Sequence, residues 1–223
     1  MSALRPHVVP IFATPFGVVA LPQARAFNAA LAELFAARAA RDEGAAGGAP
    51  GRRVFVSHDD LLEWAEDPVR QTMREVLAGA TSVASSISEL SGEELAALHI
   101  QARAWFTIVR PNGCVPAMSY PNTSWLAVYC VTAPEPSPER VDSGVLRMHE
   151  SRMDTSFQDP AHQRHRVPYR RGHYTWRPVP GELAVLPAAL IHEIATVRAE
   201  GTLTLITARV RFAGGSGAWM PPW

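Results

Sequence analysis

From about residue 100 onward, the spacing of the apolar residues constrains the fold more than any other feature of this sequence. Between residues 100 and 108 the even positions are apolar, whereas the odd positions hold Gln101, Arg103, Trp105 and Thr107. Successive residues of a β-strand point to opposite faces, so this alternation predicts a half-buried strand. Further strands are predicted at 126–132, 145–149, 174–177, 182–186, 192–197 and 203–212. Because turn-forming segments rather than helices separate them, the C-terminal half is predicted to form a β-sandwich or barrel.

The first hundred residues are predicted to be mainly helical. In the alanine-rich segment 23–41, one helical face carries Phe27, Leu31, Leu34 and Phe35, a spacing that predicts a buried stripe. Residues 42–51 are rich in Gly, Ala and Pro and predict a surface loop. Ahead of the helix, the β-branched segment 8–20 is interrupted by prolines and a glycine, which is typical of two short edge strands joined by a turn.

Two further helices are indicated by capping residues. Asp59 or Asp60 is predicted to cap a short helix that reaches Trp64. Asp67 followed by Pro68 indicates an N-cap and a first helical position. The buried stripe of this second helix is predicted to consist of Val69, Met73, Val76 and Leu77.

A last helix and the domain organisation follow from the same kind of pattern. Ser91 and Glu94 have capping-box spacing ahead of a helix predicted at 95–99. We expect one domain over 1–223. Within it, edge strands and helices would occupy 1–99, the β core 100–213 and a flexible tail 214–223, in which Trp219 and Trp223 could dock on a surface.

The charge balance and cysteine content limit the partners and the compartment. The chain has 21 Lys+Arg and 21 Asp+Glu residues, so nothing favours nucleic acid or an acidic membrane surface as a partner. All basic residues are arginine, which excludes Schiff-base catalysis by a lysine of this chain. Only Cys114 and Cys130 are present, and neither a long apolar run nor a signal-peptide pattern occurs. We therefore expect a cytoplasmic protein that binds a small molecule or another protein.

The order of several motifs resembles that of the 2-oxoglutarate- and Fe(II)-dependent oxygenases. The motifs are FATPFGV, SHDDLL, AWFTIVRPNG, PNTSWLAVYCV, PGELAVLPAALIH and a closing basic and aromatic strand. Together they span nearly the whole chain. The resemblance implies a mainly β fold, the double-stranded β-helix or jelly roll, flanked by N-terminal helices. It also implies Fe(II) and 2-oxoglutarate as the family's cofactors, although a fold alone fixes no reaction.

In that family two histidines spaced H-x-H follow the tryptophan-containing strand, and a third, from a later strand, completes the iron site. Met118 and Tyr120 stand at the positions of the pair, and His192 matches the third ligand. The resemblance thus implies a degraded metal site that retains one ligand of three. Either these three residues hold a different metal, for which a thioether would favour Cu(I) over Fe(II), or Met118 and Tyr120 fill the emptied pocket.

The family also carries an arginine, usually in R-x-S on the last core strand, that binds the distal carboxylate of 2-oxoglutarate. When Phe212 is matched to the family's terminal phenylalanine, Thr207 takes the arginine position and Arg209 the serine position. Thr207, Arg209 and Arg211 share one face of the predicted strand, which indicates a cofactor or carboxylate site there. The alternative is that these arginines pair with acidic side chains on the surface.

Other histidines suggest a rewired metal or acid–base site. His149–Glu150 and His192–Glu193 are adjacent pairs on predicted strands. Because neighbours on a strand point to opposite faces, both members of a pair do not easily enter one pocket. A further group is expected in a solvated arginine-rich loop: His162, His165 and His173.

Three functional hypotheses stay open. The first is a diverged oxygenase-like enzyme that binds a small carboxylate and acts through a rewired metal or without one, with Tyr120 and His192 as its catalytic residues. The second is a non-catalytic binding module or a partner subunit of an active oxygenase. Whether the chain pairs with another protein or forms a homodimer stays open as well. The third is an ordinary Fe(II)/2-oxoglutarate oxygenase whose metal ligands lie at other positions.

Overall fold

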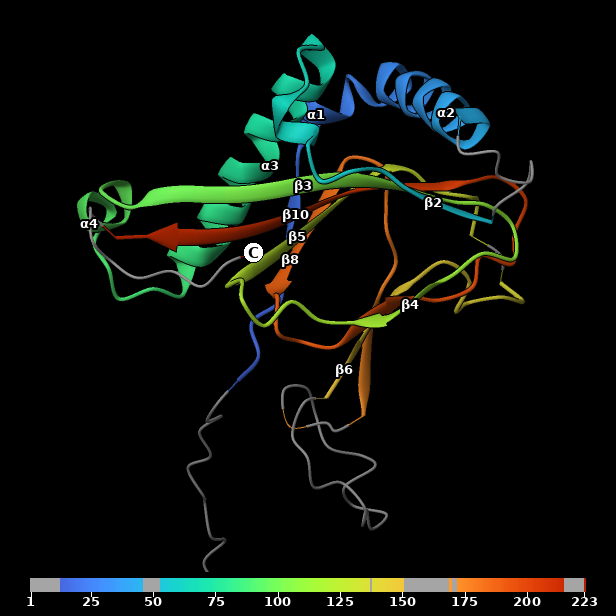
Figure 1. Ribbon diagram of the computed structural model, residues 1–223. Coiled ribbons are helices and arrows are strands. Elements are labelled where there is room, and N and C mark those ends of the chain that lie inside the picture. The colour runs from blue at the N-terminus through green and yellow to red at the C-terminus, as the bar shows by residue number, and fades with distance from the viewer. Residues whose placement is uncertain (1–12, 46–52, 137, 151–168, 170–171, 215–222) are drawn as a thin grey trace, which may run out of the picture.

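The computed structural model describes residues 13–45, 53–136, 138–150, 169, 172–214 and 223. Within these ranges two antiparallel sheets face each other, and helices cover the outer side of the larger one (Figure 1). The larger sheet has the order β1 (Gly17–Ala20), β8 (Glu182–Pro187), β5 (Trp125–Thr132), β10 (Leu203–Ala213), β3 (His99–Val109) and β2 (Val54–Val56). The smaller sheet has the order β4 (Val115–Met118), β9 (His192–Ile194), β6 (Leu146–His149) and β7 (His173–Trp176). The predicted jelly roll is confirmed.

The helices are concentrated in the N-terminal part of the chain. They are α1 (Pro22–Arg25), α2 (Asn28–Ala45), the 3₁₀ helix η1 (Leu61–Glu63), α3 (Asp67–Ser86) and α4 (Gly92–Ala96). Figure 1 shows α2 and α3 on the side of the large sheet that faces away from β4 and β6. None of the helices in the described ranges has the length and apolar character that crossing a bilayer requires.

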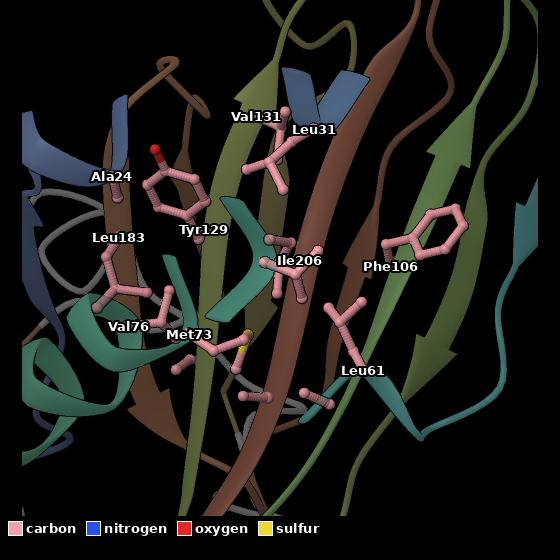
Figure 2. Packing of buried hydrophobic residues seen from close by; sticks show 14 of the residues in the cluster. Ala24, Leu31, Leu61, Met73, Val76, Phe106, Tyr129, Val131, Leu183 and Ile206 are labelled. Atoms are coloured by element: carbon pink, nitrogen blue, oxygen red, sulfur yellow. The ribbon is translucent and has the colours of Figure 1, made fainter. Parts of the chain in front are cut away.

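The strands of the large sheet bury two different faces. Even-numbered residues of β3 and β10 and odd-numbered residues of β5 pack against the helices, as Phe106, Ile206 and Tyr129 do (Figure 2). The opposite face packs against the small sheet, where Val128 and Leu205 meet Leu146 and Ile194 in a second apolar cluster. The alternation predicted at 100–108 therefore separates a helix-facing side from a barrel-facing side.

The helix-facing core is fixed by aromatic stacking and by one polar anchor. The rings of Phe35 in α2 and Phe106 in β3 stack with centroids 4.1 Å apart. Asn28, at the start of α2, donates from Nδ2 to the carbonyl oxygen of Val131 at 2.8 Å. Its Oδ1 accepts a hydrogen bond of 2.7 Å from the hydroxyl of Tyr129. These contacts hold α2 against β5 and β3 on the helix-facing side of the large sheet.

Several predicted helix boundaries were wrong. The helix predicted at 23–41 is divided between α1 and α2, and α2 continues through Asp42 to Ala45, so the predicted loop begins later; residues 46–51 of that loop lie outside the described residues. The continuation includes an ion pair of 2.8 Å between Arg38 and Asp42, one helical turn apart. This pairing stabilises the carboxylate, so the pKa of Asp42 is lowered.

The other helix starts differ from the prediction by a few residues. Asp60 precedes η1, but its carboxylate accepts from the indole Nε1 of Trp64 at 3.1 Å and makes no capping hydrogen bond. Glu66, not Asp67, is the N-cap of α3 because its backbone is still extended. The capping box of Ser91 and Glu94 is confirmed, but it starts α4 at residue 92, so the helix predicted at 95–99 was placed too late.

The predicted strands agree with the structure within a few residues, with three corrections. β9 ends at Ile194 rather than at residue 197, and the short strands β2 and β4 were not predicted. His173 begins β7 instead of lying in a loop, whereas His162 and His165 lie outside the described residues. Of the two predicted edge strands, β1 lies at the edge of the large sheet; residues 8–12 and Trp219 lie outside the described residues.

A tight turn carries the chain from β3 to β4 and so positions the site. Asn112 has a positive φ of 64° and its backbone N–H donates to the carbonyl oxygen of Val197 at 2.7 Å. At Gly113 a Cβ would lie 2.5 Å from the carbonyl oxygen of Arg53, a distance that only glycine avoids. The turn thereby locks β4 beside β9.

Candidate functional site

Met118, Tyr120 and His192 meet at the end of the small sheet. β4 and β9 pair with Met118 directly opposite His192. Two residues further on, the backbone N–H of Tyr120 donates to the carbonyl oxygen of Ala188 at 2.7 Å, which fixes this segment. The hydroxyl of Tyr120 donates to Sδ of Met118 at 3.1 Å, and the rings of Tyr120 and His192 are 5.9 Å apart. The three sequence-predicted positions therefore form one cluster.

His192 is held as a neutral imidazole with one defined tautomer. Its side chain is buried, and Nδ1 lies 2.8 Å from the carbonyl oxygen of Leu190. A carbonyl only accepts hydrogen bonds, so Nδ1 carries the proton and Nε2 keeps its lone pair. Burial lowers the pKa of His192 and outweighs the opposing effect of the Leu190 contact. Nε2 is thus a proton acceptor near neutral pH.

Tyr120 is a phenol rather than a phenolate. Burial raises the pKa of its hydroxyl, and the nearby positive charge of Arg209 offsets this only in part. The protonated hydroxyl is already directed at the sulfur of Met118. The side chain therefore acts as a hydrogen-bond donor, not as an anionic ligand.

Arg209 of β10 faces this cluster and is surrounded by aromatic rings. Its guanidinium carbon lies 5.1 Å from the ring centroid of Tyr120, 5.8 Å from that of Trp105 and 5.3 Å from that of Trp223. Such rings stabilise a cation through their negative faces without using its N–H groups. Its only ion-pair distance among the described residues is a long one, 3.7 Å from Nη2 to Asp59 Oδ2. The rings hold the guanidinium in place, while the described residues provide it with only this one long ion-pair contact.

One donor of Arg209 has no partner in the described part of the chain. The Nε atom is buried and makes no hydrogen bond to any of the described residues. A buried unsatisfied donor is costly, and in a native fold it calls for a reason such as a bound ligand. Nε and one Nη together form the edge that a carboxylate occupies in a two-bond contact.

The other two predicted cofactor-binding residues lie on the same face of β10 but in different surroundings. Thr207 is half-buried between Trp105 of β3 and Val128 of β5 in the sheet register. Arg211 is buried, donates from Nε to Oε1 of Gln101 at 2.9 Å, and lies 4.0 Å from the ring centroid of Trp223. Arg209 therefore accompanies Tyr120 and His192, whereas Arg211 belongs to a neighbouring group.

The donor set at this cluster does not fit Fe(II). It consists of one imidazole, one thioether and one phenol whose pKa is raised, whereas the family's Fe(II) site uses the histidine pair as well as the histidine that His192 matches. Across the described ranges, no group of three or more His, Cys, Asp or Glu residues is arranged to hold a metal ion. The chemistry open to this cluster is proton transfer at Nε2 of His192 and hydrogen bonding from Tyr120 and Arg209.

The adjacent His–Glu pairs do not share a pocket. His192 points into the barrel, while Glu193 lies on the outer face, where Oε1 accepts from Arg147 at 2.6 Å. Nε2 of His149 lies 3.7 Å from the same carboxylate oxygen. Cys114 is exposed, and Cys130 is buried with its pKa raised by that burial. The thiol of Cys130 is thus an inert part of the core.

Three contributors to the site were not predicted from the sequence as such. Alternation predicts Trp105 only on the face opposite the apolar one, and its place beside Arg209 comes from the register of β3 and β10. Asp59 was read only as a helix cap, and Gln101 only as a polar strand residue. Trp223 was predicted to dock on a surface; the surface that it covers is formed by Arg209 and Arg211.

Comparisons with known proteins place the fold. No family model matches the sequence, and no curated protein does. Among solved structures, AviO1 from Streptomyces viridochromogenes Tue57 is similar with a TM-score of 0.56 and 15% identity, over 94% of each chain. A prolyl hydroxylase from Trichoplax adhaerens gives 0.54 and 10%, over 87% of this chain and 82% of that one. SnoK, a non-heme alpha ketoglutarate dependent carbocyclase from nogalamycin biosynthesis, gives 0.54 and 12%, over 90% and 80%.

These identities are too low to carry more than the fold. The chain has the double-stranded β-helix of 2-oxoglutarate-dependent oxygenases over most of its length, as the order of its motifs indicates. A fold of this kind hosts many reactions, so function has to be argued from the residues at the barrel mouth.

Proposed function

We propose that this protein binds a small dicarboxylate such as 2-oxoglutarate at Arg209, in the mouth of an oxygenase-type barrel from which the iron chemistry has been lost. The observation that carries the proposal is the buried Nε of Arg209, which has no hydrogen-bond partner among the described residues. A carboxylate oxygen at that atom would remove the cost of an unsatisfied donor.

The surroundings of Arg209 favour a carboxylate over a permanent protein partner. Asp59 is half exposed, and its carboxylate makes only a long contact of 3.7 Å with Nη2. Its side chain can therefore turn to water when a ligand arrives. The three aromatic rings limit the rotation of the guanidinium and leave its N–H edge available. Both features favour a two-bond contact, for which arginine is better suited than lysine.

Tyr120 and His192 supply the polar groups for the rest of the ligand. The hydroxyl of Tyr120 can exchange its bond to the sulfur of Met118, a weak acceptor, for a stronger bond to a ligand oxygen. Nε2 of His192 carries a lone pair and accepts a proton from a bound ligand. In the catalytic version of this proposal, Arg209 holds the substrate, Tyr120 orients it and His192 is the base.

A second candidate is a non-catalytic ligand-binding module or partner subunit. It is favoured by the internal bond between Tyr120 and Met118, because the two side chains at the positions of the family's ligand pair are bonded to each other. The two versions share the carboxylate at Arg209. They predict different results for His192→Gln. In the catalytic version the variant loses turnover of the bound ligand, whereas in the non-catalytic version the ligand binds without turnover in both proteins.

The binding proposal is tested by thermal unfolding with 2-oxoglutarate and with succinate. We expect both to raise the unfolding midpoint of the wild-type protein, because a ligand that binds only the folded state stabilises it. The shift should be absent in Arg209→Ala and retained in Arg74→Ala, which removes an exposed arginine of α3. Absence of a shift with either ligand in the wild type would overturn the proposal.

Iron analysis of protein purified without chelators tests the proposed loss of the iron site. We expect no stoichiometric iron, because one imidazole, one thioether and one phenol bind Fe(II) poorly. Iron at one equivalent, lost in His192→Ala and accompanied by turnover of 2-oxoglutarate, would instead identify an ordinary oxygenase with ligands at other positions.

A further inference from the structure

A second recess lies beside Arg209, at the edge of the large sheet. It is a cleft of ≈ 470 Å³, within the range of about 300–1,000 Å³ that is usual for small-molecule sites. It is lined by Asp59, Leu62, Glu63, Gln101, Ala102, Arg103, Arg211 and Trp223. Arg209, Tyr120 and His192 are not among these residues, but Asp59 and Trp223 also contact Arg209, so the cleft adjoins the site described above.

The cleft exists because β2 is short. β2 pairs with β3 only from residue 107 to residue 109, and the chain touches β3 again at the bridge between Asp60 and Ala104. Beyond that bridge η1 covers the edge of β3 without hydrogen-bonding to it as a strand. One wall of the cleft is therefore the acidic end of η1, and the other is the polar face of β3 and β10.

The strand wall carries two guanidinium groups. Arg211 is only 6% exposed, is fixed by Oε1 of Gln101 and stacks on the ring of Trp223. Arg103 is half-buried and forms no salt bridge within the described part of the chain. The amide nitrogen of Gln101 remains as a further donor, since only its oxygen is used by Arg211. This wall suits a carboxylate.

The opposite wall carries two carboxylates and the apolar surface. Glu63 is exposed and has no ion pair with any described residue, and Asp59 has only the long contact to Arg209. Leu62 and the indole of Trp223 add apolar surface between the charged groups. A simple anion would leave Glu63 without a counter-charge among the described residues, and a simple amine would do the same to Arg103.

From these opposed charges we infer that the cleft binds a zwitterionic α-amino acid with an apolar or aromatic side chain. Its carboxylate pairs with Arg103 and the amide of Gln101, its ammonium group with Glu63 or Asp59, and its side chain lies against Trp223 and Leu62. This inference goes beyond the proposed carboxylate site and does not depend on it, because Arg209 makes none of the contacts named here, although Asp59 and Trp223 border both sites.

Calorimetric titration with three related compounds tests the inference. L-Phenylalanine carries both charges, N-acetyl-L-phenylalanine lacks the ammonium group and phenethylamine lacks the carboxylate. We expect L-phenylalanine to bind the wild-type protein and to bind about tenfold or more tightly than either derivative, since each loses one charge-assisted contact.

Two variants assign the contacts. Arg103→Gln should lower the affinity for L-phenylalanine by about tenfold and leave the affinity for phenethylamine unchanged. Glu63→Gln should lower the affinity for L-phenylalanine and leave the affinity for the N-acetyl compound unchanged. Glu63 lies on an exposed 3₁₀ helix, so this second variant keeps the test valid if Arg103→Gln fails to fold. Arg74→Ala, which removes an exposed arginine of α3 that does not line the cleft, is the matched control and should retain L-phenylalanine binding.

The outcomes separate the two sites. Loss of L-phenylalanine binding in Arg103→Gln with retained 2-oxoglutarate binding supports an independent amino-acid site. No measurable heat with L-phenylalanine at millimolar concentration, equal affinity for all three compounds, or full retention of binding in both cleft variants would overturn the inference.

Discussion

The two faces of β10 follow different rules. On the helix-facing side Ile206, Ala208 and Val210 are fully buried in apolar surroundings. On the barrel-facing side the strand begins with two buried leucines and continues with Thr207, Arg209 and Arg211. The helix-facing side is packed throughout, whereas the barrel-facing side leaves the Nε of Arg209 without a partner among the residues that the structure describes. Departures from good packing of this kind are expected at functional sites.

The largest effect is expected on the helix-facing side. Ile206→Ala removes a fully buried side chain from the core shown in Figure 2 and should lower the free energy of unfolding by about 2–5 kcal/mol. Thr207→Ala, the next residue on the opposite face, is the matched control and should cost less than about 1 kcal/mol. Equal losses in denaturant unfolding would show that the two faces do not differ in this way.

A smaller loss is expected at the polar anchor of the same core. Tyr129→Phe removes the hydroxyl that donates to Oδ1 of Asn28 and leaves that part-buried oxygen without this donor. The free energy of unfolding should fall by about 1–2 kcal/mol. A double-mutant cycle with Asn28→Ala measures the coupling; an interaction energy near zero would mean that the hydrogen bond does not hold α2 on β5.

On the barrel-facing side, removal of a charge should be tolerated. Arg209→Met keeps much of the volume, contacts the same rings and removes the unsatisfied Nε. The free energy of unfolding should change by less than about 1 kcal/mol, with stabilisation as the favoured sign. A loss comparable with that of Ile206→Ala would assign Arg209 to the structural core instead of to a binding site.

The smallest effect is a pH dependence at His192. Its pKa is lowered in the folded protein, so the unfolded chain binds the extra proton more readily. The stability is complete above the unfolded pKa near 6.5 and is lost as the pH falls from there through the folded pKa. His192→Asn, which keeps a donor for Leu190, should show a shallower decline of the unfolding midpoint from about pH 7.5 to about pH 5.5. Equal slopes in the two proteins would contradict this.

Periodicity predicted much of the fold because both faces of the long strands are committed to different layers. Residues 100–108 and 203–212 alternate clearly, and both became long neighbouring strands, β3 and β10. β2 and β4 were missed because three or four residues, one of them Pro116, carry no measurable period. α2 continues beyond its predicted end, where Asp42 pairs with Arg38 and Glu43 pairs with Arg110, two contacts that the loop-like composition does not indicate.

The residues of the site were predictable from the sequence, but which of them lie together in the structure was not. The order of motifs singled out Met118, Tyr120 and His192, and the register of β4 and β9 brings them together. Strand alternation placed Arg209 and Arg211 on one face, but it gave no reason to separate them. The separation comes from Trp223 and Gln101, which engage Arg211, and from Trp105 and Tyr120, which surround Arg209. Contacts between segments far apart in the chain leave no local signal.

The most direct test is a calorimetric titration of 2-oxoglutarate into the wild-type protein and into Arg209→Lys. Lysine keeps the positive charge but lacks the planar pair of donors that Nε and Nη form. We predict binding of one ligand per chain in the wild type and a loss of affinity of about tenfold or more in the variant. Equal affinities in the two proteins, or no binding in the wild type, would contradict the carboxylate site at Arg209.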